Sequence, residues 1–109
     1  MSMTKITTVE EWEKLLSDEE QFYFLKNSTT CPISTQAFDE TEKFSEEAQS
    51  VPVYYLNVQE ARPLSNEIAN HVNVKHESPQ IFLVEGGEVK WHASHWNVTK
   101  DTLSKALDK

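Results

Sequence analysis

Three short, continuous apolar runs constrain the fold of this chain more than any other feature. They are Phe22–Leu25, Val53–Leu56 and Ile81–Val84, and each is shorter than an ordinary buried helix. The segments between them, residues 33–48 and 64–72, instead repeat apolar positions at helical spacing. Strands that are apolar throughout are typical of sheets covered by helices on both faces. The pattern therefore predicts an α/β fold.

The glycine pair Gly86–Gly87 follows the third apolar run directly. Glycine supplies the positive φ that a tight hairpin turn needs, so residues 88–93 are expected to return as an antiparallel strand. A helix between the first two strands makes those strands parallel. The predicted architecture is thus a four-stranded mixed sheet flanked by helices.

Helix start signals lie near both ends of the chain. Thr8 and Glu11 have the spacing of a capping box, and Thr99 stands where an N-cap would precede the apolar positions of a last helix. No linker, repeat or low-complexity tract interrupts the 109 residues, which is the length of one domain. We therefore expect a single domain over residues 1–109.

The chain is acidic, with 18 aspartates and glutamates, 10 lysines and arginines, and a formal net charge of -8. Nucleic acids and anionic membranes both attract basic surfaces, so neither is expected as a partner. No apolar run approaches the ~18 residues that cross a bilayer, and the first residues do not resemble a signal peptide. We expect a cytoplasmic protein.

Cys31 is the only cysteine, so no internal disulfide can form, as is usual in a reducing cytoplasm. It follows the first predicted strand, and Pro32 then occupies the first position of a helix, where a missing N–H costs nothing. The free N–H groups of a helix N-terminus favour the nucleophilic thiolate. A lone cysteine is most often buried and unreactive, but this position favours a nucleophile.

The string Thr30-Cys31-Pro32-Ile33-Ser34 resembles the active site of thioredoxin-fold proteins. Its Cys-Pro-x-Ser form is similar to a monothiol glutaredoxin site, and the whole string closely matches the monothiol bacilliredoxins of bacillithiol-using bacteria. Ser78-Pro79 before the third run resembles the cis-proline of the thioredoxin fold, and the glycine pair resembles its following hairpin. The resemblance covers nearly the whole chain and implies a thioredoxin-like fold with a cis bond beside Cys31.

The chain also departs from the dithiol thioredoxins at three positions. Ser34 stands where they have a resolving cysteine, Thr30 replaces their tryptophan, and His95 replaces a glycine late in the returning strand. A two-cysteine cycle is therefore impossible, which favours mixed-disulfide chemistry. The Ser34 hydroxyl either hydrogen-bonds the thiolate or is a polar residue of the first helical turn with no special role.

The resemblance implies an enzyme that removes bacillithiol from protein mixed disulfides. Cys31 attacks the mixed disulfide, releases the client thiol and keeps bacillithiol until a second thiol removes it. The expected partners are bacillithiolated client proteins, a low-molecular-weight thiol and a disulfide reductase. Bacillithiol is the expected co-substrate, and no bound cofactor is expected.

Bacillithiol is a cysteine–glucosamine–malate conjugate, so its carboxylates require local positive potential on this acidic protein. The helix N-terminus is one source. The side-chain candidates are Lys26, Lys75, His76 and His95, and the family topology implies that both histidines lie near Cys31. The alternative for His95 is packing on Trp96 or simple exposure to solvent.

Three other functions compete with this reading. A one-cysteine peroxidase also uses a helix-start cysteine, but such chains are longer and have an upstream proline. An iron–sulfur carrier of the monothiol glutaredoxin type has Cys-Gly-Phe-Ser where this chain has Cys-Pro-Ile-Ser. A redox-inactive binding module would carry an unreactive Cys31. Metal binding is not expected, because His92 and His95 point to opposite faces of a strand.

Overall fold

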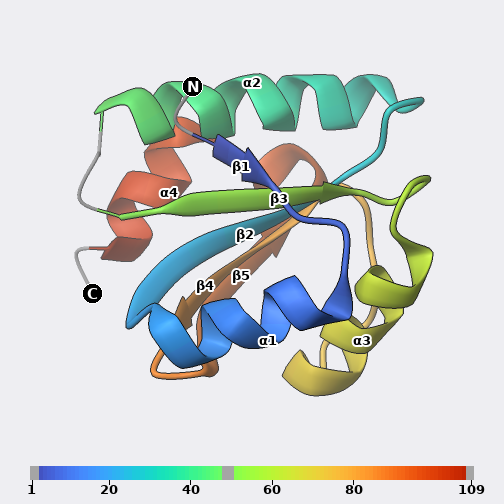
Figure 1. The fold of residues 1–109 in the computed structure, drawn as a ribbon. Helices are drawn as coiled ribbons and strands as arrows, with labels where there is room; N and C mark the ends of the chain where they lie inside the picture. The colour runs from blue at the N-terminus through green and yellow to red at the C-terminus, as the bar shows by residue number, and fades with distance from the viewer. Residues whose placement is uncertain (1–2, 48–50, 108–109) are drawn as a thin grey trace.

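The computed structural model describes residues 3–47 and 51–107 and shows one sheet with helices on both faces (Figure 1). The elements in chain order are β1 (Met3–Lys5), α1 (Val9–Asp18), β2 (Gln21–Asn27), α2 (Pro32–Glu47), β3 (Val53–Asn57), α3 (Arg62–Val72), β4 (Gln80–Glu85), β5 (Glu88–Ser94), the 3-10 helix η1 (His95–Asn97) and α4 (Lys100–Leu107). No helix in the described ranges is long and apolar enough to cross a membrane.

The sheet has five strands in the order β1-β3-β2-β4-β5, so the expectation of four strands is wrong. The additional strand is β1, which pairs parallel to β3 with Met3 opposite Val53. Only Met3 of its three residues is buried, so β1 is too short to show an alternating pattern. Two other pairings are as expected: β2 runs parallel to β3, and β4 runs antiparallel to β5. In addition, β4 runs antiparallel to β2, which joins the parallel strands to the hairpin.

The apolar run of β2 is continuous because both faces of that strand are buried. Tyr23 and Leu25 belong to the core under α2 and α4, whereas Phe22 and Phe24 belong to the core over α1 and α3. Side chains alternate between the faces of a strand, so one run supplies two cores. Each of these four side chains is fully buried, which stabilises the fold by about 2 kcal/mol per side chain.

The predicted local signals are confirmed at both helix starts and at the hairpin. Thr8 Oγ1 accepts from the Glu11 N–H over 3.1 Å, and Glu11 Oε1 accepts from the Thr8 N–H over 3.1 Å. Thr99 Oγ1 accepts from the N–H of Thr102 over 3.1 Å at the start of α4. Gly86 and Gly87 have φ values of 60° and 81°, so the hairpin uses the positive φ of both glycines.

The strand register brings three segments to one edge of the sheet. Gln80, at the start of β4, pairs with Lys26 near the end of β2 and with Ser94 at the end of β5. The loop that leads from β2 to Cys31, the loop that carries Ser78 and Pro79, and the turn into η1 therefore meet at this edge. Functional sites of open α/β sheets lie at such edges.

Candidate active site

Cys31 lies immediately before the first turn of α2 and is partly exposed. The N–H groups of Ser34 and Ile33 hydrogen-bond the sulfur and lower the pKa of Cys31 from its ordinary value, while its slight burial acts in the opposite direction. The Cys31 carbonyl accepts from the Thr35 N–H over 3.2 Å, which closes the first turn. The sulfur therefore has both solvent access and thiolate character.

The Ser34 side chain is fully buried at the start of α2. Its hydroxyl makes no hydrogen bond of ordinary geometry to another described residue, and among the groups that lower the pKa of Cys31 it has the smallest effect. The backbone N–H groups thus stabilise the thiolate more than the serine hydroxyl does. Of the two alternatives for Ser34, a weak effect on the thiolate fits the geometry.

Gln59, two residues after the end of β3, holds the loop that precedes Cys31. Its Oε1 accepts from the Thr29 N–H over 3.1 Å, and its Nε2 donates to Ser28 Oγ over 2.9 Å and to Thr30 Oγ1 over 3.3 Å. No role for Gln59 was predicted from the sequence, where its only signal is its place after a strand that ends at the same edge. A cavity of about 260 Å³ lies between this loop and α2. It is lined by Asn27, Ser28, Thr29, Thr35, Phe38 and Asp39.

The Ser78–Pro79 peptide bond is cis, which confirms that prediction. The loop before it is fixed by Gln80, which is fully buried. Gln80 Nε2 donates to the Lys75 carbonyl over 3.0 Å, and Gln80 Oε1 accepts from the Glu77 N–H over 3.3 Å. The loop therefore has a defined shape at the sheet edge where α2 begins.

His95 lies beside the cis-proline, because its N–H donates to the Pro79 carbonyl over 2.9 Å. It adopts a φ of 54°, in the left-handed region that favours glycine. Its Nδ1 is 3.8 Å from Glu77 Oε1, a carboxylate for which the sequence predicts no role. The next residue, Trp96, is 61% exposed.

His76, in the loop before the cis-proline, contacts Lys26 near the end of β2. Lys26 Nζ is 3.2 Å from His76 Nδ1, and the Lys26 side chain is fully buried. Burial, followed by the charges of Lys26 and Arg62, lowers the pKa of His76, so its ring is neutral at pH 7. Lys26 therefore does not supply the surface positive charge expected of it, because β2 carries it into the protein interior.

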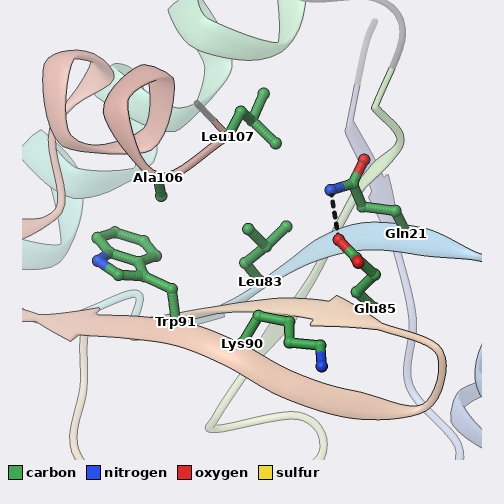
Figure 2. A pocket seen from close by; sticks show the side chains of 7 residues that line it. All are labelled: Gln21, Leu83, Glu85, Lys90, Trp91, Ala106 and Leu107. Carbon is green, nitrogen blue, oxygen red and sulfur yellow. Dashed lines mark hydrogen bonds between the residues drawn. The ribbon is translucent and has the colours of Figure 1, made fainter. Parts of the chain in front are cut away.

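A larger cavity, of about 400 Å³, lies where β4 and β5 face α4 (Figure 2). Its lining residues are Gln21, Leu83, Glu85, Lys90, Trp91, Ala106 and Leu107, and Gln21 Nε2 donates to Glu85 Oε2 over 3.0 Å. Gln21 and Glu85 are at the opposite ends of β2 and β4 from Cys31 and Pro79. This cavity is thus separate from the cysteine site.

Comparison with known proteins agrees with the fold and identifies the family. Residues 4–103 match the family described as monothiol bacilliredoxin BrxC. A solved protein described by its thioredoxin fold is 38% identical, with a TM-score of 0.92, and the match covers 97% of this chain and 94% of that chain.

Thioredoxins with low sequence identity to this chain share only its fold. One from Trypanosoma brucei brucei is 17% identical with a TM-score of 0.80, over 98% of this chain and 88% of that chain. Mitochondrial thioredoxin 3 from Saccharomyces cerevisiae is 17% identical with a TM-score of 0.79, over 98% and 94%. With its single cysteine at the start of α2, the chain belongs to the monothiol bacilliredoxins, a thioredoxin-fold family with a thiol redox role.

Proposed function

We propose that this protein removes bacillithiol from protein mixed disulfides by thiol–disulfide exchange at Cys31. The observation that carries the proposal is the pair of N–H groups, from Ser34 and Ile33, that hydrogen-bond a partly exposed sulfur and lower its pKa. A thiol with a pKa nearer to ambient pH is a more effective attacking group in exchange. Family membership supports bacillithiol as the small thiol that is exchanged.

The first step exchanges one disulfide for another. The Cys31 thiolate attacks the bacillithiol sulfur of the mixed disulfide, a Cys31–bacillithiol bond forms, and the client–bacillithiol bond breaks. The client leaves as a thiolate and takes up a proton from solvent. No net oxidation or reduction occurs in this step.

The second step needs a thiol from outside the chain, because Ser34 occupies the position of a resolving cysteine. A low-molecular-weight thiol, deprotonated to its thiolate, attacks the bacillithiol sulfur and displaces the Cys31 thiolate. The product is a disulfide between that thiol and bacillithiol, which a separate disulfide reductase returns to two thiols. Resolution is therefore intermolecular and depends on the concentration of the small thiol.

Ser78 and Pro79 are the groups assigned to the client. An extended client backbone can pair with the main chain of Ser78, as peptides do at exposed strand edges. The exposed indole of Trp96 lies in the turn that follows His95 and adds apolar contact area at the same edge. His95 is the side chain assigned to the carboxylates of bacillithiol.

Intact-mass measurement of the protein after mixing with a bacillithiolated peptide tests the proposal. We expect one bacillithiol adduct per chain and release of the free peptide thiol. Cys31→Ser should give neither product, whereas Ser34→Ala should give both. A peptide that carries glutathione instead of bacillithiol reports thiol selectivity. If the protein remains unmodified after prolonged mixing with excess bacillithiolated peptide, the proposal is overturned. If the protein instead consumes peroxide, the result favours a peroxidase.

A further inference from the structure

Lys26 is the only charged residue whose side chain is fully buried within residues 3–47 and 51–107. Its Nζ donates to the Ser65 carbonyl of α3 over 3.0 Å and lies 5.8 Å from the centroid of the Phe82 ring on β4. No described carboxylate forms an ion pair with it. A buried ammonium without an anion is costly unless hydrogen bonds compensate it, so its partners matter.

The third partner of Lys26 is His76 Nδ1, at 3.2 Å. An ammonium can only donate, so Nδ1 accepts and the ring is the neutral form with its proton on Nε2. Ser65 Oγ lies 3.3 Å from the same nitrogen. Burial lowers the pKa of Lys26 to about 8, so the ammonium is charged at neutral pH while His76 is not.

His76 precedes Pro79 by three residues, in the loop that leads to β4. Gln80 shapes this loop from within, and Ser94 Oγ donates to Glu77 Oε2 over 3.0 Å to connect it to β5. His76 Nδ1 connects the loop to β2 through Lys26 Nζ and to α3 through Ser65 Oγ. Without the Lys26 contact, the loop remains attached to β4 through Gln80 and to β5 through Glu77 but loses its side-chain connection to β2.

We propose that buried Lys26 and neutral His76 form an anchor that positions the Ser78–Pro79 loop for client binding, and that protonation of His76 releases the anchor. The proposal rests on the proposed function, because the client is the substrate of the same site. Lys26 is thus a positioning residue: it acts on the client only through the loop.

The charges around His76 explain why protonation would release it. Lys26 on β2 and Arg62 on α3 oppose an imidazolium, and only Glu77 on the same loop favours it. Protonation also removes the acceptor at Nδ1, which leaves two positive charges in contact. His76 is an exposed residue, so the charged ring can turn toward solvent while the core stays intact.

The test measures two rates across pH and takes their ratio. The first is exchange with a bacillithiolated protein client, which needs the loop. The second is alkylation of Cys31 by iodoacetamide, a small neutral reagent that needs only the thiolate. Both rates follow the titration of Cys31, so their ratio removes that effect, and a comparison with a variant that lacks only the His76 imidazole isolates the loop. From about pH 7 to about pH 5, where histidine titrates, we expect the ratio to fall about tenfold in the wild type.

Three variants sharpen the test. His76→Asn places an amide oxygen at the position of Nδ1 and cannot be protonated, so its ratio should fall much less than that of the wild type across this pH range. Lys26→Met should give a low ratio at every pH. Lys105→Met, the same change at an exposed position of α4, should behave as the wild type.

The outcomes separate the anchor from the proposed function. A wild-type ratio that does not depend on pH, or one that falls equally in His76→Asn, overturns the anchor. If Cys31 is alkylated but never exchanges with the client, the proposed function fails instead. If Lys26→Met does not fold, the comparison of the wild type with His76→Asn still gives the answer.

Discussion

The backbone N–H of His95 donates to the carbonyl oxygen of Pro79 over 2.9 Å, and His95 adopts a φ of 54° where it makes this bond. The bond connects the end of β5 to the loop that carries the cis-proline. For residues with a Cβ, this left-handed conformation is about 1–2 kcal/mol less favourable than the right-handed one. The protein therefore tolerates backbone strain at a position beside its active-site loop.

His95→Gly should increase the free energy of unfolding by up to about 1 kcal/mol, because glycine adopts a positive φ without steric cost. The lost contact with Glu77 is half-exposed and contributes little to stability. Urea denaturation measures the change. His92→Gly, the same substitution at an exposed position of β5, is the control and should lower the free energy of unfolding. Equal destabilisation by both substitutions would show that His95 carries no strain.

Glu77→Gln should accelerate exchange with bacillithiol mixed disulfides relative to a neutral small disulfide. The Glu77 carboxylate lies 3.8 Å from His95 Nδ1, where it would repel the carboxylates of bacillithiol in the proposed complex. His95→Gly should have the opposite effect on this ratio of rates, because it removes the group assigned to those carboxylates. Both effects should shrink at high salt, since the groups are exposed. Ratios that remain unchanged in both variants would show that neither residue interacts with the charge of bacillithiol.

The thiolate absorbance of Cys31 should appear with a midpoint below the ~8.5 of a free thiol. Because folding lowers the pKa of Cys31, its contribution to stability is fully present above the unfolded pKa and is lost as pH falls through the folded pKa. The thermal stability of the wild type relative to Cys31→Ser should therefore increase as pH rises from the folded to the unfolded pKa of Cys31. A midpoint at or above the free value would contradict the assignment of a nucleophile.

Ser34→Ala should retain most of the exchange rate and shift the pKa of Cys31 only slightly upward. The hydroxyl has the smallest effect among the groups that lower this pKa, whereas the Ser34 and Ile33 N–H groups remain in the variant. The exchange rate and the thiolate titration should be measured on the same preparation. A rate as low as that of Cys31→Ser would give Ser34 an essential role that this geometry does not support.

The strands could be predicted from the sequence because burial on both faces makes a run such as Phe22–Leu25 continuous. β1 could not, because three residues with a single buried side chain carry no periodicity. The positive φ of His95 could not be predicted from the local sequence, because histidine ordinarily adopts a negative φ.

The partners of Lys26 and Gln59 could not be predicted, because they come from distant parts of the chain. Lys26 continues the buried pattern of β2, but Ser65 and His76, which compensate its charge, lie 39 and 50 residues later. A lysine after an apolar run is ordinarily the exposed end of a strand. Gln59 and Thr29 are 30 residues apart and meet only because β2 and β3 end at the same edge of the sheet.

Gln59→Ala should lower the exchange rate at Cys31 and leave the pKa of Cys31 nearly unchanged. The variant loses the hydrogen bonds that connect Gln59 to Ser28, Thr29 and Thr30, so the loop before the nucleophile becomes less ordered. The N–H groups that stabilise the thiolate belong to α2 and are not altered. We expect a fall of about tenfold in the rate, equivalent to about 1.4 kcal/mol of lost positioning.

Gln36→Ala provides the matched control, because Gln36 is an exposed residue of α2 close to Cys31 in sequence. Its exchange rate should equal that of the wild type. Thiolate titration of both variants separates positioning from electronic effects. If Gln59→Ala raises the pKa of Cys31 enough to account for the whole loss of rate, the loop acts through the stability of the thiolate. If the pKa is unchanged and the rate falls, Gln59 positions the sulfur for attack.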